Sequence, residues 1–391
     1  MNDVKDEYKK RIKNVIESAK EKNIVNSAFK AIATKKIYIY GAGNAGAMTF
    51  KLLKDVKIEV EAFLDRRGGD NMHYYGKPVY KADDVSITNS VKNSSLVIIA
   101  FICGYKELNE TQSWLKSLGY QNIFYYHHIY NLFVTNRLIK EENGGTGNNA
   151  DMATYLNSVE NKILRVSELF EDEESRSIYY NFLEAIFNAN PDIFSLPSDQ
   201  LQYFVEDIPF SKGYGRFIDC GAFDGDTALQ LKECKGMAEA IALFEPDTDN
   251  FKKLCDNLTK NRVANEQVIL PCGLWRETEM LRFRSGIQSS SGISEEGDTF
   301  IQCLALDDVL ADFAPTFIKM DIEGAEFEAL IGSKNMIKRY RPDLAISVYH
   351  SIEHMWEIPM LISSLGLGYK FYLRPHGVYG METIMYASCE E

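Results

Sequence analysis

The segment Phe217–Thr227, with the sequence FIDCGAFDGDT, has the pattern of a buried strand that ends in a glycine turn before a helix. Glycine has no Cβ atom, so a backbone turn built from it can approach a ligand closely. About twenty residues past the last glycine, the apolar run 242–246 (ALFEP) ends a second strand at Glu245. A carboxylate in that place can accept two hydrogen bonds from a ribose diol. The spacing predicts an α/β sheet that binds a nucleoside.

Carboxylates surround this glycine turn: Asp219, Asp224 and Asp226. Because carboxylates repel phosphate, the turn does not suit a pyrophosphate. It suits a ligand with a positively charged end, and S-adenosylmethionine carries an ammonium and a sulfonium group. The charge of the turn therefore favours S-adenosylmethionine over a dinucleotide.

A second glycine turn lies near the N-terminus. The short β-rich run 36–40 is followed by the segment 41–46 (GAGNAG), and the predicted strand 60–64 ends at Asp65. The order of strand, GxGxxG turn, helix and acid fits the dinucleotide-binding fingerprint. This turn has no acid, and its bare amides suit phosphate. The candidate residues of a second nucleotide site are Gly41, Gly43, Gly46 and Asp65.

Strands alternate with helices in both halves of the chain, which predicts an α/β protein with two Rossmann-like, doubly wound parallel sheets. The length of 391 residues is sufficient for two or three domains. We expect a helical lead at 1–34, a Rossmann-like nucleotide-binding domain at 35–140, a polar glycine-rich linker at 141–150, a helical segment at 151–212 and a second α/β domain at 213–391.

Composition excludes several classes of partner. The formal net charge of −13 argues against broad binding to nucleic acid or to anionic lipid. We expect no membrane span, because no apolar run approaches about 18 residues. The seven cysteines are scattered, without CxxC pairs or zinc spacings, and the charged N-terminus does not resemble a signal peptide. These features indicate a cytoplasmic protein with reduced thiols.

The segment Phe317–Glu326 (FIKMDIEGAE) is the second strong signal, because it brings ionisable groups to the carboxyl end of an apolar strand. Ligand crevices of open α/β sheets lie at this end, so we expect Asp321 to face the crevice. Glu323 and Glu326 could serve the same site, or could merely complement the dipole of the following helix.

Histidines follow the next predicted strand, at residues 344–349. His350 and His354 are four residues apart, which would place both on one face of a helix. They could provide a general base or part of a divalent-metal site with Asp321, or could be solvated side chains at an ordinary helix start. The pair His127-His128 is expected to be a solvated strand end rather than a metal site.

Four motifs of the C-terminal half occur in a characteristic order: Asp219-x-Gly-Ala-x-x-Gly225, Phe244-Glu-Pro246, Leu306-Asp-Asp308 and Ile318–Glu326. Through them, roughly residues 213–388 resemble the FkbM-like methyltransferases, which are S-adenosylmethionine-dependent O-methyltransferases often found with sugar and polysaccharide biosynthesis. The resemblance implies a class I methyltransferase fold for this half. This sequence has Phe223-Asp224 where the family often has asparagine, which leaves the exact contacts of the turn open.

The resemblance also implies roles for individual residues. Around the methionine part of the cofactor it places Asp219, Gly221, Ala222 and Gly225. It places Glu245 on the ribose, and Gly273 and Leu274 near the adenine.

Methyl transfer to oxygen is an in-line displacement that needs an oriented acceptor, exclusion of water and removal of a proton. A sugar hydroxyl is a poor nucleophile at neutral pH, so a base or a metal must assist. The candidate catalytic residues are Asp321 and His350, and the candidate ligands of a divalent metal are Asp321, His350 and His354. The candidate acceptor-binding residues are Lys319, Glu323, Glu326, Trp356, Arg374 and His376, although Trp356 is equally compatible with a core position.

The N-terminal half has a resemblance of its own, carried by the segments 39–46, 63–65 and 76–80. Through them, residues 35–130 resemble the nucleotide-binding domain of sugar acetyltransferases of the PglD type. The resemblance implies a nucleotide-sugar site. A structural or vestigial domain and a redox cofactor such as NAD are the alternatives.

Three functions compete at this stage. The first is an S-adenosylmethionine-dependent O-methyltransferase that acts on a sugar, nucleotide-sugar or glycan hydroxyl, and the acids around Asp219 and Asp321 favour it. The second is an oxidoreductase or isomerase that uses the N-terminal turn. The third is a non-catalytic module that binds nucleotide sugars. A homo-oligomer is compatible with each of them.

Overall fold

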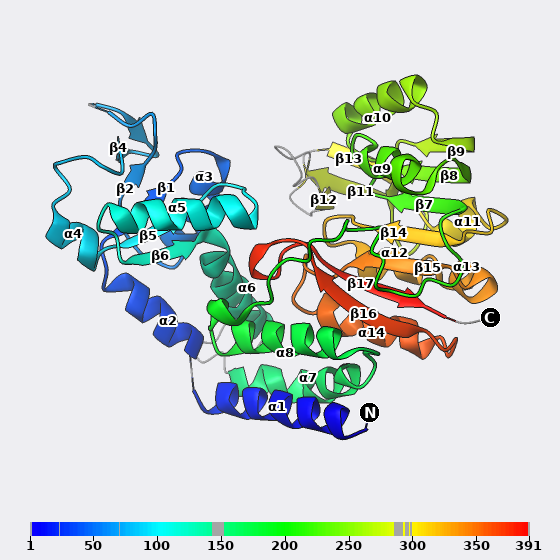
Figure 1. The fold of residues 1–391 in the computed structure, drawn as a ribbon, viewed down its shortest axis with the longest axis horizontal. Helices are drawn as coiled ribbons and strands as arrows, with labels where there is room; N and C mark the ends of the chain where they lie inside the picture. Colours follow the sequence, from blue (N-terminus) through cyan, green and yellow to red (C-terminus); the bar gives the residue numbers. More distant parts are fainter. Residues whose placement is uncertain are drawn as a thin grey trace.

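The computed structural model describes residues 2–22, 24–69, 71–142, 152–284, 292–293, 297 and 299–389. Most of the predicted linker, residues 143–150, lies outside the described residues. Figure 1 shows two sheets on opposite sides of the molecule, with the helices α1, α7 and α8 forming a layer below the C-terminal one. The predicted α/β class with two Rossmann-like sheets is confirmed.

Within the described residues, the N-terminal half forms a six-stranded sheet in the order β3-β4-β2-β1-β5-β6. All pairs are parallel except β3 with β4. The central strands read IYIY and LVII and are buried throughout, as expected for strands covered on both faces. The strands are β1 (Ile37–Tyr40), β2 (Val60–Leu64), β3 (His73–Tyr74), β4 (Lys77–Tyr80), β5 (Leu96–Ile99) and β6 (Asn122–Tyr125). The helices are α3 (Asn44–Asp55), α4 (Asn89–Ser94), α5 (Tyr105–Ser117) and α6 (Tyr126–Glu142).

The described part of the C-terminal half forms a seven-stranded sheet in the order β16-β17-β15-β14-β7-β8-β9. Five strands are parallel neighbours, and the last strand, β17, inserts antiparallel between β15 and β16. This is the strand order expected of the class I methyltransferase fold. The strands are β7 (Arg216–Cys220), β8 (Ala238–Phe244), β9 (Ala264–Leu270), β14 (Phe317–Met320), β15 (Asp343–Ser347), β16 (Lys370–Pro375) and β17 (Thr383–Ser388).

Helices and a smaller sheet complete this half. The helices are α9 (Asp226–Lys235), α10 (Thr248–Lys260), α11 (Leu306–Val309), α12 (Glu326–Ile331), α13 (Lys334–Tyr340), α14 (His354–Ser364) and the 3₁₀ turn η2 (Val378–Gly380). As far as residues 273–304 are described, a four-stranded sheet is inserted between β9 and β14. Its strands are β10 (Gly273–Leu274), β11 (Glu279–Arg284), β12 (Gly292–Ile293) and β13 (Thr299–Leu304).

The predicted helical lead at 1–34 divides into two helices with different neighbours. The first, α1 (Asn2–Glu21), packs on α7 (Met152–Ser167) and α8 (Glu173–Phe187), and α8 packs on strand β16. The second, α2 (Ile24–Ala33), packs on α6 of the N-terminal half. The short 3₁₀ turn η1 (Pro191–Ile193) follows α8. The first twenty or so residues therefore belong to the helical layer of the C-terminal half.

The expectation that His127 and His128 are solvated is wrong. Both side chains are buried, with 5% and 4% exposure, in the first turn of α6. Burial lowers the pKa of His127 to about 3 and that of His128 to about 4. The ring of Tyr379, from η2 of the other half, lies 4.3 Å from the ring of His128 and stacks on Tyr125. The histidines therefore lie at the junction of the two halves.

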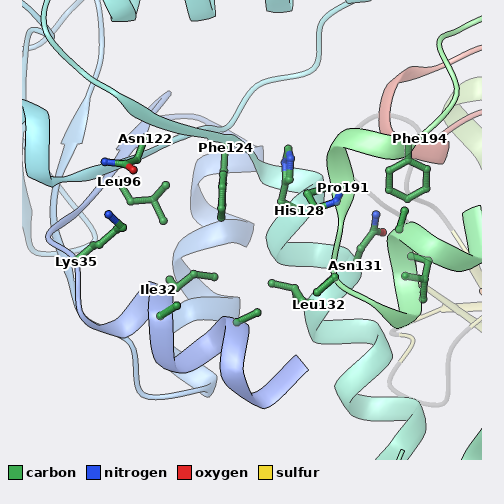
Figure 2. Close-up of a pocket in the computed structure, with 15 residues that line it drawn as sticks. Ile32, Lys35, Leu96, Asn122, Phe124, His128, Asn131, Leu132, Pro191 and Phe194 are labelled. Atoms are coloured by element: carbon green, nitrogen blue, oxygen red, sulfur yellow. The ribbon is translucent and has the colours of Figure 1, made fainter. Parts of the chain in front are cut away.

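An apolar cavity of about 280 Å³ lies beside this junction. Figure 2 shows Ile32 and Leu96 on one side of it, Phe124 and His128 between, and Pro191 and Phe194 on the other. None of the residues predicted to hold cofactor, acceptor or metal line it. It is therefore distinct from the group of polar residues at the carboxyl edge of the C-terminal sheet.

Among the helices that the structure describes, none has the combination of length and hydropathy needed to cross a membrane. The seven cysteines all lie in the described part of the chain and are free thiols.

Candidate active site

Glycine at position 221 is required by the geometry of the turn after β7. Gly221 has a φ of +95°, and a Cβ atom added there would lie 1.9 Å from the backbone oxygen of Asp321 on the neighbouring strand end. Its N–H donates to the carbonyl of Phe244 at 3.1 Å, which joins the turn to the end of β8. Gly225, with a φ of +89°, begins helix α9 and packs against Leu254. The turn is therefore held tightly between the ends of β8 and β14.

Glu245 lies at the carboxyl end of β8 with 6% exposure. Its Oε2 atom accepts from the N–H of Phe223 in the glycine turn at 2.9 Å, and its Oε1 atom accepts from the N–H of Asp247 at 2.8 Å. Burial raises the pKa of this carboxyl to about 7, against the two backbone donors. Each oxygen keeps further acceptor capacity, so the carboxylate can still receive hydroxyl donors.

Asp219 was expected to contact the cofactor, but its side chain is fully buried beneath the turn. It faces Lys319, its register partner on β14, and the Lys319 Nζ lies 2.9 Å from the Asp219 Oδ1. Lys319 also donates to the carbonyl of Gly221 at 2.6 Å. Burial raises the pKa of Asp219 to about 6 against the pull of Lys319. In this structure the pair supports the turn from below, and neither side chain is available to a ligand.

Asp321 follows β14 and keeps 22% of its side chain exposed. Its Oδ2 atom accepts from the hydroxyl of Tyr203 at 2.7 Å, and the hydroxyl of Tyr349 lies 3.5 Å from Oδ1. Two tyrosines from different parts of the chain therefore hold the carboxylate at the edge of the sheet.

His350 and Glu326 form the centre of the cluster. Glu326, the first residue of α12, is fully buried and accepts from the N–H groups of Ile322 and Gly324 through Oε1. The same oxygen lies 2.8 Å from Nδ1 of His350. The opposite nitrogen, Nε2 of His350, faces Asp321 Oδ1 at 3.6 Å and Glu323 Oε2 at 3.5 Å. The histidine thus links the ends of β14 and β15.

The charges of the cluster are strongly coupled. Burial alone would lower the pKa of His350, but Glu326, with Asp321 and Glu323 nearby, raises it to about 10. Burial opposes ionisation of Glu326, yet His350 holds the pKa of this carboxyl well below its usual range. Burial raises the pKa of Glu323 to about 7. The carboxylates around His350 therefore favour its protonated form, whereas a general base must be neutral before it accepts a proton.

The two histidines do not share a helix face as predicted. His350 precedes α14, and His354 is its first residue. They meet instead on Glu326, whose Oε2 atom lies 3.4 Å from Nδ1 of His354. Asp321, Glu326 and His350 each place one possible ligand atom within 4.8 Å of the others, so Glu326 and not His354 joins the two other predicted residues.

Three further candidates for acceptor binding lie elsewhere. Trp356 is fully buried in the core. Arg374 has 3% side-chain exposure and pairs with Asp172 at 2.7 Å and Asp207 at 2.6 Å, so it fastens β16 to the N-terminus of α8 and to the following loop. His376 lies 2.8 Å from the hydroxyl of Tyr386. These contacts are structural, and Trp356 and Arg374 have no surface to offer to a sugar.

The positions proposed near the adenine are buried in the small sheet. Leu274 has 2% exposure, and a Cβ at Gly273 would meet Cys303 and Ile301 at 3.0 Å and Pro246 at 4.0 Å. Pro246 directly follows Glu245, so Gly273 borders the end of β8. These residues form the floor beside Glu245 rather than an exposed wall.

Three further residues lie close to the cluster. Glu382 directly precedes β17 and accepts from Gln202 at 2.9 Å, and burial, with Asp321 nearby, raises the pKa of its carboxyl. Tyr203 precedes the first strand of the sheet by more than ten residues and so carries no local signal. The charge of Glu323 adds to burial in raising the pKa of Tyr130, which lies on α6. Helix α6 of the N-terminal half therefore carries a tyrosine that is within electrostatic reach of Glu323.

The N-terminal turn has the predicted backbone geometry. Gly41 has a φ of +122°, and a Cβ there would lie 2.5 Å from the carbonyl of Ala100. Asp65 Oδ2 accepts from the N–H of Ala42 at 3.0 Å. Both oxygens of Asp65 also accept from the Arg67 guanidinium, at 2.8 and 3.1 Å, and this pairing holds the pKa of the carboxyl well below its usual range. Asp65 is therefore engaged by a cation in this structure.

Comparisons with known proteins bear on the C-terminal half most directly. A search of the curated proteins finds no match. The fold is similar to the crystal structure of Methyltransferase FkbM from Methylobacillus flagellatus KT, with a TM-score of 0.67 and 22% sequence identity over 93% of this chain and 99% of that chain. This similarity shows that the fold, including the N-terminal half, is shared. Residues 219–371, which contain the glycine turn, Glu245 and the Asp321–His350 cluster, match the family model of the Methyltransferase FkbM domain.

Proposed function

We propose that the protein transfers a methyl group from S-adenosylmethionine to a hydroxyl oxygen of a sugar, nucleotide-sugar or glycan acceptor. One observation carries the proposal. The residues in question lie in a row along the carboxyl edge of the sheet, in the order Glu245 after β8, Gly221 after β7, Asp321 after β14 and His350 beyond β15. Strand order reverses between β7 and β14, and ligands of open α/β sheets bind at such a point.

Glu245 and the turn at Gly221 fit the nucleoside part of the cofactor. The Glu245 carboxylate is preorganised by the N–H groups of Phe223 and Asp247, so ribose hydroxyls would meet a fixed acceptor. When bound, the sulfonium supplies an electrophilic methyl group. The chain's part is to bind the nucleoside, to exclude water and to hold the methyl group toward the Asp321 end of the crevice.

Asp321 is placed to handle the acceptor. Its carboxylate is partly exposed and is oriented by the hydroxyls of Tyr203 and Tyr349. An acceptor hydroxyl that donates to Asp321 would be both oriented and ready to lose its proton to that oxygen as the bond to the methyl carbon forms. The assignment of a sugar to the acceptor rests on the resemblance of the four sequence motifs to the FkbM-like family.

The test measures S-adenosylhomocysteine formed with a panel of monosaccharides, nucleotide sugars and oligosaccharides. Asp321→Asn keeps the shape of the side chain and removes its charge. We expect turnover to fall about a hundredfold or more while S-adenosylmethionine binding stays near that of the wild type. Full activity of the variant would assign proton removal to another group, and absence of methyl transfer to every acceptor would contradict the proposal.

A second proposal concerns the N-terminal turn, which we infer to bind a phosphate-bearing nucleotide or nucleotide sugar. Helix α3 begins after Gly43 without a side-chain cap, so its first amide groups can face an anion. Arg67 lies beside Asp65 at the same edge. Thermal shifts with nucleotides, nucleotide sugars and NAD test this. A shift with NAD alone would favour the redox alternative, and no shift with any of them would leave a structural or docking domain.

A further inference from the structure

In the cluster around His350, two buried polar atoms lack a hydrogen bond. Nε2 of His350 and Oε2 of Glu326 have no hydrogen-bond partner among the residues that the structure describes. The side chain of His350 is 9% exposed, and that of Glu326 is fully buried. Buried polar atoms normally have partners, so these two atoms keep the capacity to bind a ligand.

The distances around Nε2 of His350 suit a shared ion better than hydrogen bonds. Asp321 Oδ1 lies 3.6 Å away and Glu323 Oε2 lies 3.5 Å away, whereas a charge-assisted hydrogen bond measures about 2.7 to 2.9 Å. Two ligand atoms bound at about 2.1 Å to one tetrahedral ion lie about 3.4 Å from each other. Nε2 of His350 therefore lies at ligand-to-ligand distance from one carboxylate oxygen of Asp321 and one of Glu323.

The far side of the imidazole is arranged as in metal sites. A histidine that binds a metal through one nitrogen usually donates its other N–H to a carboxylate, which fixes the tautomer and the ring orientation. Glu326 Oε1, 2.8 Å from Nδ1 of His350, has that position, and the N–H groups of Ile322 and Gly324 hold it in place. With a proton on Nδ1, the lone pair of Nε2 points at Asp321 and Glu323.

The surrounding charge favours a cation. The carboxylates of Asp321, Glu323, Glu326 and Glu382 interact with His350 through their charges. Glu323 adopts a φ of +55°, a conformation that residues other than glycine rarely adopt. Its carboxylate lies 3.5 Å from Nε2 of His350. A bound divalent ion would offset the mutual repulsion of these groups.

We propose that His350 Nε2, Asp321 and Glu323 form a binding site for a divalent transition-metal ion such as Mn²⁺ or Zn²⁺, with Glu326 as the residue that positions His350. A donor set of one imidazole and two carboxylates suits such ions. The inference deepens the proposed function and rests on it in one respect. An ion with three protein ligands keeps open positions, at which an acceptor hydroxyl would bind and lose its proton more readily.

Direct ion binding tests the proposal without relying on activity. Protein stripped with a chelator is titrated with Mn²⁺ by calorimetry, and with Co²⁺ while visible absorption is recorded. We expect the wild type to bind one equivalent, and His350→Gln and Asp321→Asn to lose it. Glu326→Gln should weaken affinity by about 10- to 100-fold and alter the Co²⁺ spectrum, because the orienting carboxylate is lost.

Glu328→Gln is the matched control. Glu328 lies on the same helix as Glu326, but it pairs with Arg276 outside the cluster, so this variant should bind the ion as the wild type does. Thermal denaturation checks that each variant is folded. If His350→Gln does not fold, Asp321→Asn provides the test. The metal site would be overturned if the wild type bound no ion, or if His350→Gln and Asp321→Asn bound it as the wild type does. His350 would then be an imidazolium held by carboxylates.

Methyl-transfer assays with and without chelator separate the two proposals. Turnover that continues in protein free of metal overturns the role of the ion in the reaction and leaves the proposed methyl transfer intact. One equivalent of ion bound at His350, without methyl transfer to any acceptor, supports the metal site and counts against the proposed reaction.

Discussion

At the N-terminal turn, the N–H of Gly41 donates to the carbonyl of Leu64, and the N–H of Ala42 donates to Asp65 at the end of β2. At the C-terminal turn, the N–H of Gly221 donates to the carbonyl of Phe244, and the N–H of Phe223 donates to Glu245 at the end of β8. In each case a Cβ on the first glycine would collide with a carbonyl of the adjacent strand end. The two turns are built on one backbone plan.

The two turns differ in the charged side chains that surround them. Asp65 is paired with the exposed guanidinium of Arg67, and β5, which lies on the other side of β1, continues into Ala100 and Phe101. Glu245 is buried without such a partner, and β14, which lies on the other side of β7, continues into Asp321. The backbone of a glycine turn thus provides a place for a nucleoside. The side chains at the nearby strand ends determine which charge the ligand can carry and which reaction can follow.

The largest expected effect is on stability and should be common to both turns. Gly221→Ala places a Cβ 1.9 Å from a backbone oxygen at a φ of +95°, so we expect unfolding free energy to fall by more than about 3 kcal/mol. Gly41→Ala should behave similarly, with a contact at 2.5 Å. Chemical denaturation followed by circular dichroism measures both.

Gly43→Ala is the control for this pair. A Cβ at Gly43 would meet nothing within 4 Å among the described residues, and its φ of −129° is open to other residues. Its stability should change by less than about 1 kcal/mol. Equal losses in Gly43→Ala and Gly221→Ala would show that close packing is not what requires glycine at position 221.

The second expected effect is a pH dependence of cofactor binding, which comes from Glu245. Burial raises the pKa of Glu245 to about 7, so in the free protein this carboxyl becomes ionised only as pH rises through neutrality. Ribose hydroxyls donate to the ionised form, so cofactor binding releases a proton below that pH and affinity rises with pH. Between pH 6 and 8 the gain should be about tenfold, levelling off above. Calorimetry in buffers of different ionisation heat measures it, and Glu245→Gln should abolish the dependence.

The raised pKa of Glu245 also makes the stability of the free protein depend on pH, but in the opposite direction. A carboxyl whose folded pKa is raised contributes most below its unfolded value, and this contribution is lost as pH rises toward about 7. Unfolding free energy of the free protein should therefore decrease between about pH 4.5 and 7 relative to Glu245→Gln. A difference between the two proteins that does not vary with pH would contradict the assignment.

The smallest effect concerns Arg67. Its guanidinium is exposed, so removing it in Arg67→Ala should change stability little. The variant frees Asp65, and the pKa of that carboxyl should return toward its usual range, as observed by NMR titration. If the N-terminal turn binds a nucleotide through Asp65 and the ribose, the variant should bind nucleosides at least as well as the wild type. Weaker binding of phosphorylated nucleotides alone would assign Arg67 to phosphate.

Sequence reasoning predicted the strands next to the two glycine turns, the turns themselves and the acids at the strand ends, because these features are encoded locally. Apolar runs of four to seven residues, followed by glycine, describe a strand and its turn wherever they occur. The gathering of Asp321, Glu326 and His350 could also be anticipated, since carboxyl ends of parallel strands share one edge.

Long-range register and packing explain what the sequence did not reveal. Asp219 meets Lys319 because β7 and β14 pair in that register, which leaves neither for a ligand. Arg374 is neutralised by acids that precede it by more than 160 residues. His128 is buried because Tyr379 packs on it from the other half. None of these partners is recognisable before the chain is folded.

The central claim is that Glu245, and not Asp65, holds the nucleoside of S-adenosylmethionine. Calorimetric titration of S-adenosylmethionine into the wild type, Glu245→Ala and Asp65→Ala tests it most directly. We predict one binding site in the wild type, a loss of roughly 2 to 4 kcal/mol in Glu245→Ala, and unchanged affinity in Asp65→Ala. Unchanged affinity in Glu245→Ala, or a loss confined to Asp65→Ala, would contradict the account.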